Sequence, residues 1–260
     1  MDLVCQQEAL IKLREFAAVD RHSVLIEGPE GCGKSYLAKQ YAKMLGVDDF
    51  SMVVANVQSI REALDCSYNL ENRVVFCIEN LDTGAAAASY TLLKFLEEPT
   101  NKVYLVITCR NLMNVPATIH SRCTIISTSA PASADIVQYA EIQNFVKFQD
   151  LKNQDIWRAV RTFKDADMVL RLTSEQLSYF YSLKSIVSFS DTIQNMSWKL
   201  GHYDDNSSTN LQFVMNYLMI LCNSPRVSRY AIECSRDLSS ERVASHAVLA
   251  KFLFECKYGD

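Results

Sequence analysis

Short hydrophobic runs alternate with amphipathic stretches over the first half of this 260-residue chain. Hydrophobic runs of this length between turn residues are typical of buried strands, whereas apolar residues at helical spacing indicate helices. The predicted strands cover residues 22–28, 51–57, 73–79, 102–109 and 123–128. The predicted helices cover residues 6–19, 34–45, 60–70, 84–98 and 116–122. This alternation predicts an α/β domain with a doubly wound, mostly parallel sheet.

The strand pattern ends near residue 129, and only helical patterns follow it. Residues 133–180 contain short helical segments, and residues 184–260 contain longer ones. We therefore predict three parts: an α/β domain over residues 1–131, a small helical domain over 132–182 and a helical C-terminal domain over 183–260.

Composition and charge narrow the function classes. The net charge of −4 excludes bulk attraction to nucleic acid as the main signature, although a local basic groove stays open. The nine cysteines form no CxxC pair, so we expect no zinc site, and reduced thiols fit a cytoplasmic protein. Asp2 and the stretch 6–8 interrupt any apolar leader, and no apolar run has the length of a membrane span. We expect no membrane partner.

The stretch Gly28–Ser35 reads GPEGCGKS and fits the phosphate-loop pattern G-x-x-x-x-G-K-[ST]. It lies between a predicted strand and a predicted helix, as this motif requires. The glycines allow main-chain N–H groups to surround phosphate oxygens, Lys34 would reach the β- and γ-phosphates, and Ser35 would hold Mg²⁺. The competing interpretation is an ordinary glycine-rich turn. The candidate nucleotide-binding residues are Gly28, Pro29, Glu30, Gly31, Cys32, Gly33, Lys34 and Ser35.

The strand at 73–79 ends in Glu79 followed by Asn80. Glu79 stands where a carboxylate on the magnesium side is expected, so we assign it to Mg²⁺ together with Ser35. Asn80 takes the place of the carboxylate that polarises the attacking water, and an amide cannot accept a proton. We therefore expect hydrolysis by this chain to be slow or absent. Asp82 is a possible substitute acid, and a role of all three side chains as helix caps is the structural alternative.

Two further motifs carry a resemblance to a known family. The helix sequence LLKFLEEP at Leu92–Pro99 and the triplet SRC at Ser121–Cys123 resemble the clamp-loader branch of the AAA+ ATPases. This branch includes the delta-prime and gamma/tau subunits of bacterial DNA polymerase III, the small subunits of eukaryotic replication factor C, and phage loaders. The stretch 22–45 looks especially like the delta-prime type, and the resemblance covers residues 1 to about 130.

The resemblance implies a function and a set of partners. Loaders of this family are five-subunit hetero-oligomeric rings that use ATP to open a sliding clamp and place it on primer–template DNA. The chain would then consist of an AAA+ domain, a lid and a collar. Arg122 in the SRC triplet would act as an arginine finger on the nucleotide of the adjacent subunit.

Several positions depart from the family pattern. The acid pair is usually Asp-Glu, whereas this chain has Glu79–Asn80. The sensor position, usually Thr or Asn, corresponds to Arg110, with Thr108 and Asn111 nearby, and the arginine expected in the lid is replaced by Val169, with Arg171 two residues later. The zinc-binding cysteines of bacterial relatives are missing, which suggests a phage or otherwise divergent source. These departures favour a subunit that binds ATP, braces the ring and completes a neighbour's site.

The family also holds DNA through its phosphates, at helix N-termini and basic side chains. The helix expected to begin near Gly84 is a candidate for such a contact, although its alanines fit tight packing equally well. Arg61, Arg73 and Arg110 are candidate helpers or ordinary surface charges.

Three alternative functions stay open at this point. The chain can be a competent motor subunit of the same ring, with Asp82 or a neighbour's group replacing the missing acid. It can be a small-molecule kinase that uses the same phosphate loop, or a scaffold that binds no nucleotide. The SRC and LEEP elements argue against the kinase, and the intact Lys34–Ser35 pair argues against the scaffold.

Overall fold

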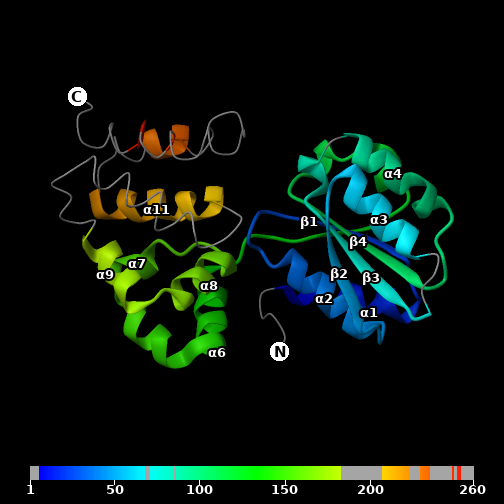
Figure 1. Ribbon diagram of the computed structural model, residues 1–260. Coiled ribbons are helices and arrows are strands. Elements are labelled where there is room, and N and C mark those ends of the chain that lie inside the picture. Colours follow the sequence, from blue (N-terminus) through cyan, green and yellow to red (C-terminus); the bar gives the residue numbers. More distant parts are fainter. Residues whose placement is uncertain are drawn as a thin grey trace. The chain divides into compact units, whose positions relative to one another are not determined.

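The computed structural model divides into two compact units, Met1–Tyr139 with Thr162–Lys164, and Ala140–Arg161 with Asp165–Asp260 (Figure 1). The structure describes residues 6–67, 71–84, 86–182, 207–222, 229–234, 248 and 251–252.

The first unit contains a five-stranded sheet in the order β2-β3-β4-β1-β5, and all neighbouring strands run parallel. The strands are β1 (Ser23–Glu27), β2 (Asp49–Val54), β3 (Val74–Glu79), β4 (Val103–Cys109) and β5 (Thr124–Ser127). Because parallel neighbours need crossover connections, helices cover both faces of the sheet. The predicted α/β fold with a doubly wound parallel sheet is confirmed.

Helices lie on opposite faces of this sheet (Figure 1), and each face has its own apolar cluster. One face packs against α3 (Val57–Ser67), α4 (Ala86–Glu97) and α5 (Ala117–His120), and the other against α1 (Gln7–Ala18) and α2 (Lys34–Met44). Successive residues of a strand point to opposite faces. Phe76 and Ile78 of β3 therefore join the first cluster, whereas Cys77 joins the second.

The second strand, predicted over 51–57, ends earlier than expected. It covers Asp49–Val54, and α3 already begins at Val57. The side chain of Asn56 explains the early helix start, because its Oδ1 accepts a hydrogen bond from the main-chain N–H of Ser59 at 2.8 Å. Such an N-cap bond satisfies a donor that the first helical turn leaves unpaired.

Two short 3₁₀ helices follow the carboxyl ends of the central strands. They are η2 (Leu81–Thr83) after β3 and η3 (Leu112–Asn114) after β4. The first of them immediately precedes the chain segment that leads to α4. This edge of the sheet therefore carries several turns close together, which is where ligands bind in open α/β sheets.

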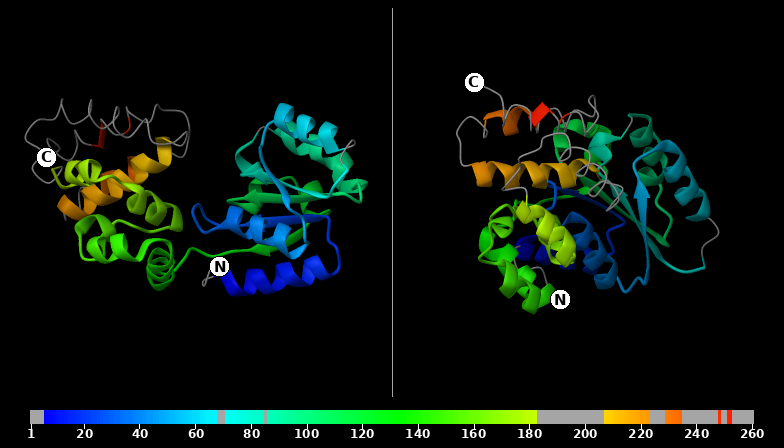
Figure 2. Two further views of the ribbon diagram at one scale, coloured as in Figure 1. Left: turned by 60° about the horizontal axis from the view of Figure 1, so that its bottom comes forward. Right: turned by 60° about the vertical axis from the view of Figure 1, so that its left-hand side comes forward.

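The described part of the second unit is helical. Its helices include α6 (Ser133–Leu151), α7 (Asp155–Arg158), α8 (Phe163–Arg171), α9 (Ser174–Ser182) and α11 (Ser207–Cys222). The first residues of α6 and of α8 belong to the first unit. Figure 2 shows α9 and α11 in further views. Phe180 contacts Phe213 and Tyr217 edge-on, with ring centroids 6.0 and 5.7 Å away. No helix in the described ranges is long and apolar enough to span a lipid bilayer.

The proposed division at 131/132 and 182/183 remains a prediction. The two compact units do not correspond to three parts, and residues 183–206, where the C-terminal domain was expected to begin, lie outside the described residues.

Candidate nucleotide-binding site

The phosphate loop begins directly after β1, and its last two residues, Lys34 and Ser35, are the first two residues of α2. Its first residue, Gly28, donates a main-chain hydrogen bond to the carbonyl oxygen of Cys109 at 3.1 Å. The loop is thereby fastened to the carboxyl end of β4, the neighbour of β1 in the sheet. The first turn of α2 follows the loop, so an anion bound there would face the positive end of the helix dipole.

The loop conformation depends on glycine at two positions. Gly31 has φ +71° and Gly33 has φ 96°, values that residues with a Cβ atom rarely adopt. Space is limited as well, because a Cβ atom at Gly31 would lie 2.5 Å from Cβ of Thr162. These glycines let the main chain curl inward, as a phosphate cradle requires.

Lys34 directs its amine into this curl. Its side chain is buried, and Nζ donates hydrogen bonds to the carbonyl oxygens of Gly28 at 2.7 Å and Pro29 at 2.8 Å. A lysine ammonium that lies among the turns of the loop is positioned to bind phosphate oxygens by charge-assisted hydrogen bonds. The arrangement fits a nucleoside triphosphate.

Ser35 and Glu79 meet beside the loop. Ser35 Oγ, on α2, donates a hydrogen bond to Glu79 Oε1, at the end of β3, at 2.8 Å. In the part of the chain that the structure describes, no group of three or more His, Cys, Asp or Glu residues converges. Magnesium does not need such a group, because it keeps several water ligands and binds phosphate oxygens with only one or two protein ligands. The two oxygen atoms therefore fit Mg²⁺ beside a bound nucleotide.

Asn80 has an unusual main chain. Its φ of 49° and ψ of 53° lie in the left-handed region, where asparagine is one of the few tolerated residues. Its N–H donates to Thr108 Oγ1 at 3.0 Å, which joins the ends of β3 and β4. Its side chain makes no capping hydrogen bond to η2, so the helix-cap interpretation does not explain this residue.

Asp82 is held by the neighbouring loop. Its Oδ2 accepts a hydrogen bond from the main-chain N–H of Asn111 at 3.1 Å. Its Oδ1 is buried and has no hydrogen-bond partner among the described residues. The role of Asp82 as a substitute acid stays a prediction.

Several residues that the sequence motifs did not single out also surround the loop. Thr128 Oγ1 lies 3.1 Å from Cys32 Sγ, and the side-chain amide of Gln6 donates to the carbonyl oxygen of Ser129 at 3.0 Å and to that of Cys32 at 3.4 Å. Phe163 donates its main-chain N–H to the carbonyl oxygen of Gly31 at 3.3 Å. These contacts join residues that are remote in sequence, so no local motif reveals them.

Arg122 lies two residues after the end of α5 and is remote in sequence from the phosphate loop. Its Nη2 contacts Glu97 Oε1 at 2.7 Å, and its Nη1 donates to the carbonyl oxygen of Thr118 at 2.9 Å and to Ser121 Oγ at 3.3 Å. One third of its side chain is exposed. The guanidinium is thus held in a defined position at the surface of the first unit.

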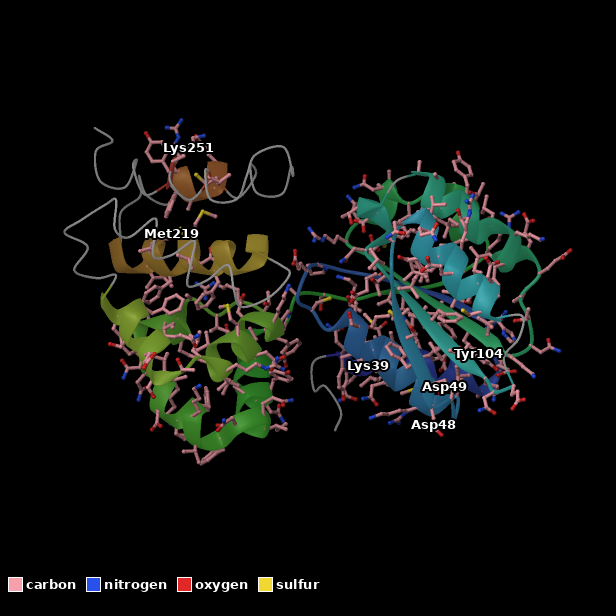
Figure 3. All side chains as sticks on the ribbon, in the orientation of Figure 1. Lys39, Asp48, Asp49, Tyr104, Met219 and Lys251 are labelled. Atoms are coloured by element: carbon pink, nitrogen blue, oxygen red, sulfur yellow. The ribbon has the colours of Figure 1, made fainter. Side chains whose placement is uncertain are left out.

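The other predicted basic residues have separate surroundings. Arg73 pairs with Asp20 at 2.5 Å and lies over the ring of Tyr104, near the amino ends of β3 and β4. Tyr104 and Asp49 lie toward this same end of the sheet (Figure 3), whereas the phosphate loop follows the carboxyl end of β1. Arg61 is exposed on α3. Their help in DNA binding stays a prediction, as does that of Arg110, whose Nη2 contacts Glu30 Oε2.

The two lid positions that the sequence singled out, Val169 and Arg171, both lie on α8. Val169 is fully buried in the second unit, and Arg171 is exposed at the end of α8.

Two family models match parts of this chain. The model described as "DNA polymerase III, delta subunit" matches residues 44–132, and the model described as "Magnesium chelatase, subunit ChlI" matches residues 1–78. A curated relative, the DNA polymerase III subunit gamma of Buchnera aphidicola subsp. Schizaphis graminum, is 25% identical over 45% of this chain. The match spans 41% of that relative's length.

Two solved structures from Thermotoga maritima share the fold. A DNA polymerase III, gamma subunit-related protein has a TM-score of 0.55 and 13% identity, and the match covers 94% of this chain and 98% of that chain. RuvB has a TM-score of 0.55 and 14% identity, with coverages of 96% and 85%. At these identities the structures establish the fold alone. The sequence matches to DNA polymerase III subunits support the predicted resemblance to clamp-loader AAA+ subunits.

Proposed function

We propose that this chain, a clamp-loader-like AAA+ subunit, binds ATP with Mg²⁺ and works within a hetero-oligomeric loader that places a sliding clamp on primer–template DNA. The observation that carries the proposal is the meeting of Ser35 with Glu79 beside a loop whose lysine amine is already directed inward. Chance similarity to a phosphate loop does not require these two oxygen atoms to meet.

Each residue of the site has a separate role in this proposal. Main-chain N–H groups of residues 30–35 and the amine of Lys34 bind the phosphates. Ser35 and Glu79 hold the magnesium ion, which would neutralise charge on the phosphate oxygens. Asn80 orients water but accepts no proton, so turnover at this chain's own site is weak.

Arg122 serves the neighbouring subunit. Its guanidinium lies at the surface and is held by a carboxylate and a main-chain carbonyl. Because the side chain is already ordered, binding to the neighbour costs little further side-chain entropy. It stabilises negative charge on the nucleotide of the next subunit. A finger of this kind, supplied in trans, contributes about 10³–10⁵ in rate.

DNA contact is proposed at α4, which begins at Ala86 close to the carboxyl end of β3. The helix has Ala86, Ala87 and Ala88 in its first turn, and Ala86 and Ala87 are exposed. Its N–H groups would face a backbone phosphate, a contact without sequence readout.

The test measures ATP binding and ATP turnover for the isolated chain, then repeats both with clamp, primed DNA and candidate partner subunits. We expect ATP binding by the wild type, loss of binding in Lys34→Ala, and turnover that is weak in the isolated chain. Strong turnover that depends on Asp82 would favour the competent motor instead. Transfer of phosphate to a metabolite would favour a kinase, and no ATP binding at all would overturn the proposal.

A further inference from the structure

The phosphate loop carries a negative charge of its own. Glu30, the third residue of the loop, is 44% exposed, and its side chain projects from a segment built to bind anions. A carboxylate beside a triphosphate would repel it. Its position therefore requires that its charge be balanced or exchanged when a nucleotide binds.

Two cations from different parts of the chain converge on this carboxylate. Arg110 Nη2 lies 3.2 Å from Glu30 Oε2, and Lys164 Nζ lies 3.9 Å from Glu30 Oε1. Arg110 follows the last residue of β4, whereas Lys164 is the second residue of α8. Neither residue belongs to the loop, yet both charges lie beside Glu30 in it.

The main chain holds both cations in place. Gly28 N–H bonds the carbonyl oxygen of Cys109, which precedes Arg110, and Phe163 N–H bonds the carbonyl oxygen of Gly31. Each cation thus follows a residue whose main chain is hydrogen-bonded to the loop itself. The side chains beyond these anchors are about two-fifths exposed.

Stability alone does not account for this cluster. Exposed ion pairs contribute little to folding, because water screens them and their side chains lose freedom. A fixed pair of cations beside a loop that binds phosphate has a stronger use in ligand binding, since charge-assisted contacts to phosphate are strong.

We infer that Arg110 and Lys164 contact the phosphates of the bound nucleotide, and that Glu30 competes with the nucleotide for both of them. This inference rests on the proposed function. When a nucleotide binds, Arg110 and Lys164 leave the Glu30 carboxylate and pair with the phosphates instead. Glu30 therefore lowers the affinity for a polyphosphate, and Arg110 and Lys164 raise it.

The experiment measures dissociation constants for ATP and for inorganic triphosphate with the full chain. Glu30→Gln should bind both ligands about 3- to 10-fold more tightly, since two partly exposed ion pairs no longer compete. Arg110→Gln and Lys164→Gln should each weaken binding. Lys12→Gln is the matched control, because Lys12 forms an exposed ion pair with Glu8 on α1 and should leave affinity unchanged.

Double variants that combine Glu30→Gln with Arg110→Gln or with Lys164→Gln show whether the two cations contact phosphate or only neutralise Glu30. If Arg110 and Lys164 contact phosphate, each substitution still weakens binding by about 3-fold or more in the Glu30→Gln background. If they only neutralise Glu30, neither has an effect in that background, and the inference is overturned although ATP binding and the proposed function stand. If the wild type binds no ATP, both fail. Unchanged thermal unfolding would show that the variants remain folded.

Discussion

Glu97 and Arg122 form an ion pair at 2.7 Å that joins α4 to the end of α5. The two residues are 25 positions apart and belong to the two sequence motifs, LLKFLEEP and SRC, that carried the family resemblance. The structure connects these motifs physically, because the carboxylate of one receives a hydrogen bond from the guanidinium of the other. The motifs therefore describe one local arrangement rather than two separate features.

Removal of the Arg122 guanidinium should affect catalysis at the neighbouring subunit's site and leave this chain's own site unchanged. Arg122→Ala should lower the ATPase of the assembled ring, by about 10³-fold or more at the site it serves, since charge on that nucleotide is no longer stabilised. The ATP affinity of this isolated chain should stay unchanged. Steady-state ATPase and equilibrium binding check the two statements, and a change confined to this chain's binding would contradict the trans role.

Loss of the pairing carboxylate should have little effect on folding. Glu97→Gln should change the free energy of unfolding by less than about 1 kcal/mol, because the pair is partly exposed. Urea unfolding measures it, with Glu8→Gln as a control for an exposed pair on a single helix. A cost of several kcal/mol would show that the pair holds the fold together rather than positioning the arginine.

Two glycines with similar main-chain conformations provide a matched comparison. Gly31 has φ +71° and Gly46 has φ +65°, but a Cβ atom would meet Thr162 at the first position and nothing within 4 Å at the second. Gly46→Ala should cost about 1 kcal/mol of stability from main-chain strain alone and leave ATP binding intact. Gly31→Ala should also weaken ATP binding, because the loop must move away from Thr162. Equal affinities in the two variants would exclude a steric role for this contact.

The left-handed main chain of Asn80 predicts a conflict between stability and activity. Asn80→Glu should cost about 1 kcal/mol, because glutamate tolerates φ of 49° less well than asparagine does. Asn80→Gly should stay within about 0.5 kcal/mol of the wild type. The introduced carboxylate should nevertheless raise ATP turnover, since it can accept a proton from water. Unfolding curves and turnover assays test both effects, and no gain in turnover would show that other departures limit hydrolysis.

Buried Cys77 predicts a loss of stability at alkaline pH. Burial raises the pKa of its thiol to about 12, and Glu79 adds to the shift, while Lys39 opposes it. The ordinary thiol pKa lies near 9, so the unfolded chain loses this proton first as the pH rises. The stabilising effect of the protonated thiol is complete below about 9 and is lost as the pH rises toward 12. The stability difference between wild type and Cys77→Ala should therefore shrink between pH 8 and about 10.5 in reducing buffer. Parallel curves would contradict the shift.

Much of the first unit was predictable because its signals are local. Apolar runs became the strands of a parallel sheet, and the segments between them became helices. The phosphate loop was evident for the same reason, since its glycines, lysine and serine are contiguous. The start of α3 was missed because the side chain of Asn56 ends the strand pattern early, a capping effect that hydrophobic periodicity does not register.

The sequence by itself determined the alternation of elements, the phosphate loop and the substitution of Asn80 for an acid, because each depends on neighbouring residues. Only the tertiary structure decided which residues that are remote in sequence come into contact. Lys164 reaches Glu30 across more than a hundred positions, and Glu97 meets Arg122 through packing of α4 beside α5. Such pairs depend on how the chain closes in space, and no spacing along it encodes them.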